Sequence, residues 1–235
     1  LARLSGARVR AGFATEGRAP FLNLTLPYEE GLSITRLNLR LAALLDAAPD
    51  DATPEFWLSA ADRAGAARWL ARQELAGGRL VVAHYGGLST PPTFLPAGAF
   101  STLVREAAGP GRRVVLLGTG AAETRWAAEV ADECPGAVHA AGLALREAAA
   151  LIEQAELFIG FNSGPAHLAA AVGTPARILF RPGPGAEREA AKWLPVSLSA
   201  RPLVPPAEAT PAELDAWCAA VASSIAAAPI APRLA

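Results

Sequence analysis

Residues 156–175 read ELFIGFNSGPAHLAAAVGTP, which is a strand, a tight turn and a helix in immediate succession. The asparagine and serine after the strand can cap the helix, the next glycine lets a ligand approach the backbone, and the proline suits a first helical turn. Such a helix start presents free amides, which attract phosphate. The candidate binding residues are Asn162, Ser163, Gly164, Pro165 and His167. The alternative is an ordinary capped helix with a packed histidine.

The same alternation of strands and helices continues on both sides, which predicts an α/β fold with a parallel, Rossmann-like sheet. Strands are expected at Leu80–Ala83, Arg113–Leu117, Leu157–Ile159 and Ala176–Phe180. Helices are expected near Pro96–Ala108, Ala122–Asp132, Leu145–Gln154 and Pro165–Val172. Doubly wound sheets bind ligands at the carboxyl ends of their strands. We therefore expect a site at that edge, beside Gly118.

The pattern predicts one complete domain preceded by a segment that is too short to be a domain. Residues 1–58 offer a strand at 7–13, a helix at 34–45 and a turn-rich linker, which is too little for a domain, so they are interpreted as the tail end of one. Residues 59–204 form the Rossmann-like domain, and residues 205–235 add a last helix and a tail.

Composition and charge exclude several classes of protein. The 21 basic residues are scattered among 22 acidic ones, so nucleic acid is not an expected partner. No apolar run approaches the roughly 20 residues of a membrane helix, and no signal region opens the chain, so we expect a cytoplasmic location. Cys134 and Cys218 lack the paired spacing of a metal or redox site and are predicted to be buried, unreactive thiols.

The turn and helix at 162–175 resemble the donor-site signature of glycosyltransferase family 9, usually written D-S-G-P-x-H-L-A-A-A-x-G-x-P. The segment GARVRAGF at 6–13, with FLN at 21–23, resembles the late N-terminal domain of that family. LLGTGAAE at 116–123 resembles the stretch that brings a glutamate, here Glu123, to the nucleoside, and 141–155 resembles the next strand-helix unit. The resemblance covers nearly the whole chain.

The resemblance implies a GT-B-type fold of two facing Rossmann-like domains, of which the C-terminal one holds an activated sugar, typically ADP-heptose. The sugar would pass to a lipopolysaccharide-core acceptor with inversion, and the absence of an Asp-x-Asp triplet suits the metal-free chemistry of the family. No cofactor is expected beyond the ADP-sugar substrate. The expected partners are that donor and a glycolipid acceptor, which would place the protein at the inner membrane surface.

The chain departs from the family pattern at the positions expected to meet the diphosphate. Thr93-Phe94-Leu95 precede Pro96 where the family has a lysine before Trp-Pro, and Asn162 replaces the signature aspartate. Arg181 can restore the missing positive charge, because a guanidinium suits phosphate; a plain surface arginine is the alternative. The expected donor-binding residues are Asn162, Ser163, Gly164, Pro165, His167, Gly118, Glu123, Thr93 and Arg181.

The general base of the family is an aspartate near the start of the N-terminal domain, and no residue of this chain corresponds to it. The chain has no methionine and opens at Leu1 within what reads as ordered sequence. We therefore expect an incomplete protein that is inactive alone, with a partner chain as one source of the N-terminal domain. The two-domain fold also implies a crossing tail. The helix at 211–228 is accordingly expected to pack against residues 1–58 through Leu214, Trp217, Val221 and Ile225.

The sequence argues against two other functions and leaves a third open. A dinucleotide site at Gly118 would need a third glycine where Glu123 stands. A serine hydrolase would need Gly-x-Ser-x-Gly around Ser163, and the sequence has Gly-Phe-Asn-Ser-Gly. The remaining alternative is a catalytically inactive relative that binds a nucleotide-sugar or a partner enzyme as a scaffold. His84 and His139 are expected to be structural or incidental.

Overall fold

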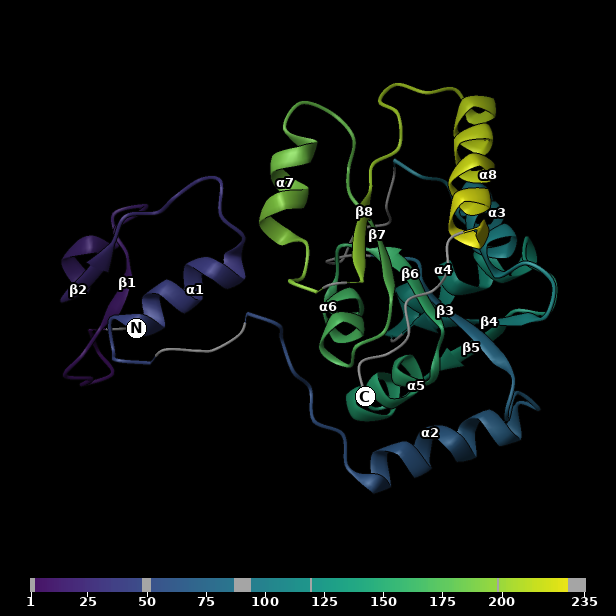
Figure 1. Cartoon of the computed structure of the whole chain (residues 1–235), viewed down its shortest axis with the longest axis horizontal. Helices are drawn as coiled ribbons and strands as arrows, with labels where there is room; N and C mark the ends of the chain where they lie inside the picture. Colours follow the sequence, from purple (N-terminus) through teal and green to yellow (C-terminus); the bar gives the residue numbers. More distant parts are fainter. Residues whose placement is uncertain (1–2, 48–51, 87–93, 119, 198, 228–235) are drawn as a thin grey trace.

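A six-stranded parallel sheet organises the C-terminal three quarters of the chain (Figure 1). The structure is a computed structural model that describes residues 3–47, 52–86, 94–118, 120–197 and 199–227. The strands are β3 (Arg79–His84), β4 (Arg112–Gly118), β5 (Val138–Ala141), β6 (Leu157–Phe161), β7 (Ala176–Leu179) and β8 (Ala200–Leu203). Their order is β5-β4-β3-β6-β7-β8, which is the doubly wound order of nucleotide-binding sheets.

Helices cover both faces of this sheet because successive strand residues point to opposite sides. Val81 and Ala83 enter one core, beneath α3 (Ala97–Ala108), α4 (Gly120–Asp132) and α8 (Pro211–Ala227). Leu80 and Val82 enter the other, beneath α2 (Ala60–Arg72), α5 (Leu145–Gln154) and α6 (Gly164–Ala171). All four predicted strands and the four helices between them are present, with bounds that differ by a few residues.

Two elements of the sheet domain, which we define as residues 59–227, were not predicted, and β5 was expected only as part of the strand-helix unit at 141–155. β8 is a short strand that contains Pro202, and proline is tolerated there because the strand lies at the edge of the sheet. α7 (Ala186–Trp193) has only eight residues, of which half are charged, and it buries only Ala190, so its sequence carries a short signal.

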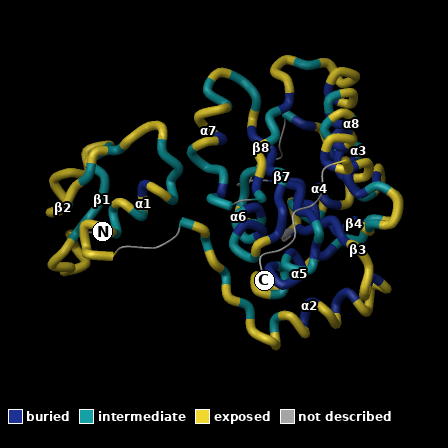
Figure 2. The backbone as a smooth tube through the Cα atoms, in the orientation of Figure 1, coloured by how far each residue is buried: buried dark blue, intermediate teal, exposed yellow. Residues whose placement is uncertain are grey.

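The described N-terminal segment, residues 3–47, is a small unit with little core of its own. It contains β1 (Ala11–Phe13), η1 (Ala19–Phe21), β2 (Leu24–Leu26) and α1 (Ile34–Ala43), and β1 pairs with β2 in parallel. Leu37 is its one buried side chain among the described residues, whereas buried residues fill the sheet domain (Figure 2). The expected strand at 7–13 is confined to the last three of those residues.

The last helix contradicts the prediction of a crossing tail. α8 packs against α3 of the sheet domain, and Cys218 and Ala222 are completely buried there with Leu214 and Ile225 (Figure 1). Small side chains on this face let the two helices approach closely. α3 offers an extended apolar face, including Leu103 and Ala107, and the N-terminal segment offers no comparable surface. Trp217 and Val221, expected to face residues 1–58, lie at the margin of the same core.

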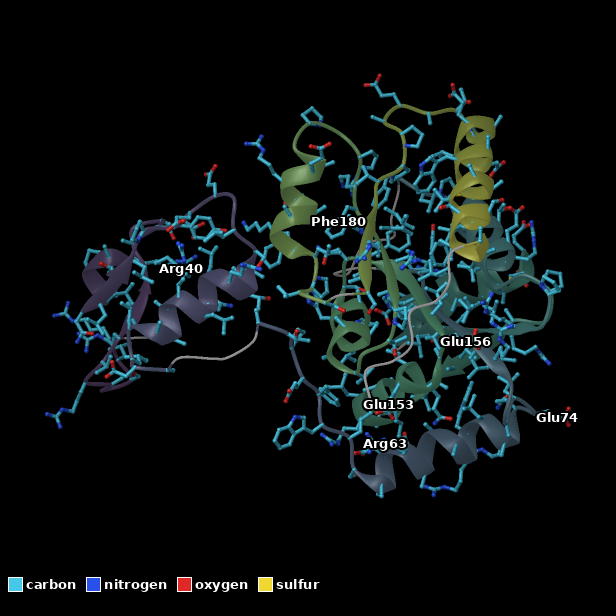
Figure 3. All side chains as sticks on the ribbon, in the orientation of Figure 1. Arg40, Arg63, Glu74, Glu153, Glu156 and Phe180 are labelled. Atoms are coloured by element: carbon cyan, nitrogen blue, oxygen red, sulfur yellow. The ribbon has the colours of Figure 1, made fainter. Side chains whose placement is uncertain are left out.

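One carboxylate ties together the amino ends of three strands. Glu156, just before β6, accepts two hydrogen bonds from Arg79 at 2.7 and 3.0 Å and one from Arg112 at 2.8 Å (Figure 3). The Arg79 guanidinium, followed by that of Arg112, holds the pKa of Glu156 below its ordinary value. The glutamate side chain is 30% exposed, so its pairs lie between the surface and buried extremes.

Glu156→Gln should lower the free energy of unfolding by about 1–2 kcal/mol, because an amide cannot satisfy two guanidinium groups. Urea denaturation would measure the change. Glu29→Gln is the matched control: Glu29 pairs with Arg40, and both side chains are about half exposed, so about 0.5 kcal/mol or less is expected. Equal losses in the two variants would contradict the special role of Glu156.

The linker before the sheet domain is fastened to α5 and α6. Ser59 and Asp62 form a capping box at the start of α2, and Arg146 of α5 bonds to Asp62 at 3.0 Å and to the carbonyl of Trp57 at 2.5 Å. The amide of Phe56 also donates to Ala171 O at 3.0 Å. Hydrogen bonds from Arg146 and then from Ser59 lower the pKa of Asp62 from 3.8 to about 2.

This lowered pKa predicts an acid-sensitive contribution to stability. Because the folded pKa of Asp62 lies below its ordinary value, its contribution is complete above about pH 4 and is lost as the pH falls towards 2. Urea denaturation of wild type and Asp62→Asn should therefore give a difference in stability that is constant near neutrality and shrinks in this acid range. A difference that persists unchanged to the acid end would rule out the ionised pair as its source.

Candidate functional site

A cavity of about 470 Å³ opens at the carboxyl edge of the sheet, where β3 and β6 lie side by side. Here the chain connections diverge to the two halves of the sheet, which is where doubly wound sheets bind ligands. Its volume is within the range of small-molecule sites. The lining residues are His84, Leu117, Gly118, Glu123, Ala140, Leu143, Leu145, Ala148, Ile152, Gly164, Pro165 and Leu168.

The polar floor of the cavity is formed by residues from three elements. His84 is the last residue of β3 and is only 3% exposed. Its Nδ1 lies 3.3 Å from Ser163 Oγ, in the turn after β6, and its Nε2 lies 3.6 Å from Glu123 Oε1, on α4. Ser163 Oγ also lies 3.0 Å from Phe161 O, to which it donates. The contacts join the two sides of the cavity.

Gly118 sets how closely α4 approaches the sheet. A Cβ atom at this position would lie 3.0 Å from Glu123 O and 3.2 Å from His139 Nε2, which leaves no room for a side chain. The close approach brings the first turn of α4, with Glu123, to the edge of the cavity. His139 comes from β5, and burial lowers its pKa, which favours the neutral imidazole.

The start of α6 forms the opposite polar rim. Gly164 is exposed, and nothing lies within 4 Å of the position where its Cβ would be. Pro165 has no N–H, and the amide of Ala166 bonds to Ser163 O at 3.1 Å, so the amides of Ser163 and Gly164 are the ones to consider for a ligand. His167 is half-buried behind this rim, and burial lowers its pKa, which favours a neutral ring.

The remaining wall is apolar and belongs mainly to α5 and the loop before it. Leu143, Ala148 and Ile152 line the cavity on this side, with Leu168 from α6. Leu145 stands at the mouth and is 64% exposed. The cavity therefore combines an apolar wall with a polar floor of an imidazole, a carboxylate and a helix start, which suits a ligand with an apolar part and a charged part.

The structure brings together some of the predicted site residues and not others. Gly118, Glu123, Gly164 and Pro165 line the cavity, and Ser163 touches its floor. Asn162, His167 and Arg181 are not among the lining residues, and Thr93 lies outside the described residues. The amide of Asn162 donates to Leu179 O at 3.1 Å, and the Arg181 guanidinium lies 5.2 Å from the centre of the Phe94 ring.

His84 is the lining residue that sequence reasoning dismissed as structural. The signal that could have found it is its position, because the last residue of a central strand at this edge faces the ligand site. The cysteines behave as expected: both are buried, and burial raises the pKa of Cys134 and raises that of Cys218 to about 12. Burial and the raised pKa both disfavour the reactive thiolate form.

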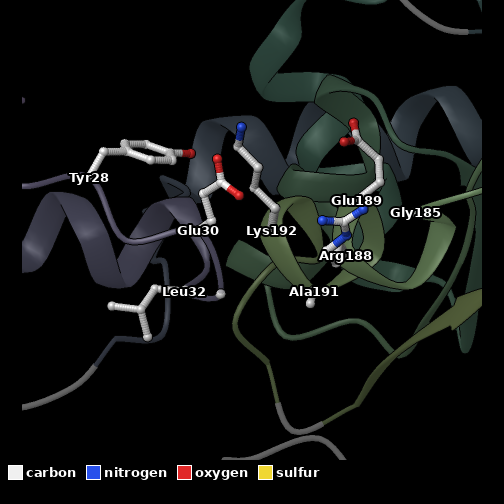
Figure 4. Close-up of a pocket in the computed structure, with 9 residues that line it drawn as sticks. Tyr28, Glu30, Leu32, Gly185, Arg188, Glu189, Ala191 and Lys192 are labelled. Atoms are coloured by element: carbon white, nitrogen blue, oxygen red, sulfur yellow. The ribbon is translucent and has the colours of Figure 1, made fainter. Parts of the chain in front are cut away.

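A second cavity, of about 320 Å³, lies between the N-terminal segment and α7 (Figure 4). The Lys192 ammonium stands 5.4 Å from the ring centre of Tyr28 and 5.2 Å from that of Trp193. A hydrogen bond with Tyr28 raises the pKa of Lys192. Arg188 and Glu189 of α7 line this cavity with Glu30. Lys192 of α7 thus contacts the N-terminal segment through Tyr28.

The described residues contain neither a cluster that could hold a metal ion nor a helix that could cross a membrane. No group of three or more His, Cys, Asp or Glu side chains in the described ranges could hold a metal ion. Within the same ranges, every helix is too short or too polar to cross a membrane. Metal-free chemistry stays a prediction.

Solved glycosyltransferase structures have a similar fold. A glycosyltransferase family 9 structure from Veillonella parvula superposes with a TM-score of 0.69 and 18% identity, over 85% of this chain and 57% of that one. The E. coli ADP-heptose lps heptosyltransferase II gives 0.66 and 20%, over 94% and 71%. E. coli heptosyltransferase WaaC, solved with ADP, gives 0.62 and 17%, over 84% and 60%.

The fold is that of the GT-B glycosyltransferases, with a parallel-sheet domain and the tail end of a second Rossmann-like domain. Residues 1–198 match the model of glycosyltransferase family 9 (heptosyltransferase), and the chain belongs to this family. A search of curated proteins gave no match. The chain spans 57% of the length of the first of these structures and 60% of WaaC, so the activity of a whole protein is a matter for proposal.

Proposed function

We propose that this chain carries the donor-binding half of a glycosyltransferase that transfers a sugar, heptose from ADP-heptose, to a lipopolysaccharide-core-type acceptor. Transfer proceeds with inversion and without a metal or other cofactor. The observation that carries the proposal is the cavity at the carboxyl edge, which joins an apolar wall to the helix start at Ser163 and Gly164. The solved relative WaaC holds ADP, which supports an adenine nucleotide as the ligand.

In this proposal, each part of the cavity has a role in donor binding. The apolar wall of Leu143, Ala148 and Ile152 receives the base, and Glu123 accepts hydrogen bonds from the ribose. The amides of Ser163 and Gly164 meet the diphosphate and stabilise the charge that develops on it as the sugar departs. The general base and the glycolipid site lie outside the residues assigned here, on an N-terminal domain, and the protein works against the inner membrane surface.

Calorimetric titration of the chain with ADP, UDP and GDP tests this assignment. We expect ADP to bind with the highest affinity. The three nucleotides differ in the base, and the base is the part that contacts the apolar wall. Equal affinity for all three would remove the adenine preference. Absence of binding would favour the second candidate, a catalytically inactive scaffold, which the loss of the family lysine at Thr93-Phe94-Leu95 already supports.

Arg181 is the proposed replacement for that lysine. Its guanidinium lies on the ring of Phe94, in the segment where the family has its lysine. The positive charge of Arg181 is therefore close to the expected position of the lysine charge. Arg181 itself does not line the cavity. Arg181→Ala should weaken ADP binding about tenfold or more, the effect of losing a hydrogen bond to a charged group. Arg72→Ala, on α2, is the control and should bind ADP as wild type does. If Arg181→Ala binds ADP as wild type does, Arg181 is a plain surface residue with no role in nucleotide binding.

A further inference from the structure

Four aromatic rings form a cluster at the carboxyl edge of the sheet, and none of them lines the large cavity. They are Tyr85, just after β3, Phe94, just before α3, Phe100 of α3 and Phe161 of β6. The Phe161 ring lies next to the other three, with centres 5.5, 5.4 and 5.5 Å from those of Tyr85, Phe94 and Phe100. Tyr85 and Phe100 also meet at 5.1 Å. Tilted and edge-on pairs at such distances are favourable beyond the area they bury, so the four rings support one another.

The cluster fixes Phe94 through its backbone and through its ring. Leu95 is completely buried, and its carbonyl accepts a hydrogen bond of 2.9 Å from the Tyr85 hydroxyl. The Phe94 ring meets that of Phe161 at an interplanar angle of 69°. Phe94 is half-buried at the margin of the core, so part of its side chain stays accessible. The ring is thus held from one side and open on the other.

The guanidinium of Arg181 lies over this ring. Arg181 is exposed, and its guanidinium carbon stands 5.2 Å from the centre of the Phe94 ring. Among the residues that the structure describes, no carboxylate pairs with it. A carboxylate would neutralise the charge and occupy the N–H donors, whereas an aromatic ring attracts the cation and leaves charge and donors available. The charge is permanent, because arginine keeps its proton in proteins.

The position of the cluster links this arginine to the turn proposed to bind phosphate. Phe161 lies two residues before Ser163, and Ser163 Oγ lies 3.0 Å from Phe161 O. The ring beside Phe94 thus belongs to the strand that leads into the start of α6. Ordering an arginine side chain costs conformational entropy, and a ligand that must order it binds less tightly. Contact with Phe94 orders Arg181 before a ligand arrives.

We propose that Phe94 is a positioning residue of the donor site: its ring, held by the aromatic cluster, orders the Arg181 guanidinium so that it meets the diphosphate of the donor. Phe94 acts through the arginine and needs no contact with the ligand. This inference rests on the proposed function of the cavity and of Arg181. It adds that an arginine can replace the family lysine here because a supported ring lies beneath it.

Calorimetric titration with ADP tests the role of the ring. Phe94→Leu removes the ring but keeps an apolar side chain against Phe161, and it should weaken ADP binding about two- to fivefold, the effect of losing an exposed cation–π contact. Phe94→Tyr retains a ring that attracts cations and should bind ADP within about twofold of wild type. Trp217→Leu is the matched control and should bind ADP as wild type does. Trp217 is also a half-buried aromatic at the margin of the same core, and no cation–π contact of the described residues involves it.

The dependence on Arg181 distinguishes positioning from general packing. In the Arg181→Ala background, Phe94→Leu should have no further effect on ADP affinity, because the ring no longer has a guanidinium to order. A loss of the same size with and without the arginine would show that Phe94 acts on the site by itself, and it would overturn the proposal. Equal ADP affinity of wild type and Phe94→Leu would also overturn it, while the nucleotide site would stand.

A second measurement needs no ligand. Protons held over the face of an aromatic ring resonate upfield, so the side-chain protons of Arg181 should be shifted upfield in the NMR spectrum of the free chain, with the assignment made by comparison with Arg181→Ala. The shift should vanish in Phe94→Leu. Wild-type resonances at the values of a mobile arginine would overturn the proposal, whether or not the Phe94 variants fold. If the shift is present but wild type binds none of ADP, UDP and GDP, the ordering of Arg181 stands and the proposed function of the cavity is wrong.

Discussion

Gly164→Leu should abolish nucleotide binding without unfolding the protein. Gly164 lines the cavity at the first position of α6, and nothing lies within 4 Å of its missing Cβ, so a leucine enters open space. The added side chain would occupy the rim where the phosphates are proposed to meet the helix amides. We expect ADP affinity to fall at least about a hundredfold. The free energy of unfolding should change by less than about 0.5 kcal/mol.

Gly98→Leu is the matched control for this variant. Gly98 is also exposed in the first turn of a helix, α3, with nothing within 4 Å of its missing Cβ, and it is remote from the lining residues of the large cavity. It should change neither ADP affinity nor stability. Calorimetry and urea denaturation of both variants make the comparison. Wild-type affinity in Gly164→Leu would show that nucleotide binds somewhere else.

Among the described glycines, Gly160 is the one at which an alanine substitution should cause the largest loss of stability. Gly160 lies inside β6, beside His84 of β3, and a Cβ there would stand 2.9 Å from Phe158 Cζ and 3.0 Å from His84 O. Because the second of these atoms belongs to the backbone, the strands themselves must shift. We expect the free energy of unfolding to fall by about 2–3 kcal/mol, the upper range for overpacked cores. Urea denaturation measures it.

A double-mutant cycle with Phe158→Leu tests the cause of that loss. The phenylalanine ring is fully buried and supplies two of the three close contacts, so the shorter side chain should relieve part of the clash. The two substitutions together should then cost less than the sum of their separate effects. Gly164→Ala, four residues further along the chain, has no neighbour to clash with and should be close to neutral. Strict additivity would contradict a steric cause.

The parallel sheet could be predicted from sequence because buried strands such as β3, β4 and β6 are continuous apolar runs separated by helical periods. β8 and α7 were not predicted because neither sequence shows a clear apolar pattern. Proline and arginine make β8 look like a loop, and the charges of α7 conceal its single buried position. The partner of α8 could not be predicted, because an apolar helical face indicates that a partner exists and not which one.

The candidate site was predicted in part. Residues on the two turns, Gly118 and Glu123 with Gly164 and Pro165, were found because glycine and a helix start leave local marks in the sequence. His84 left none, since its neighbours in the site come from positions 39 and 79 residues further along the chain, a proximity that only the sheet order creates. That the cavity binds a nucleotide-sugar remains a prediction for the titrations.

The scarcity of buried side chains among residues 3–47 decides what a melting curve of this chain can report. Both core clusters lie in the sheet domain, and the described N-terminal segment contributes Leu37 alone to the buried residues. The enthalpy and the heat-capacity change of unfolding both grow with the amount of packed, buried structure that is lost, so the calorimetric signal belongs mainly to residues 59–227. A substitution in the first 47 residues would pass unnoticed in a thermal screen, even one that destroyed every interaction this part makes.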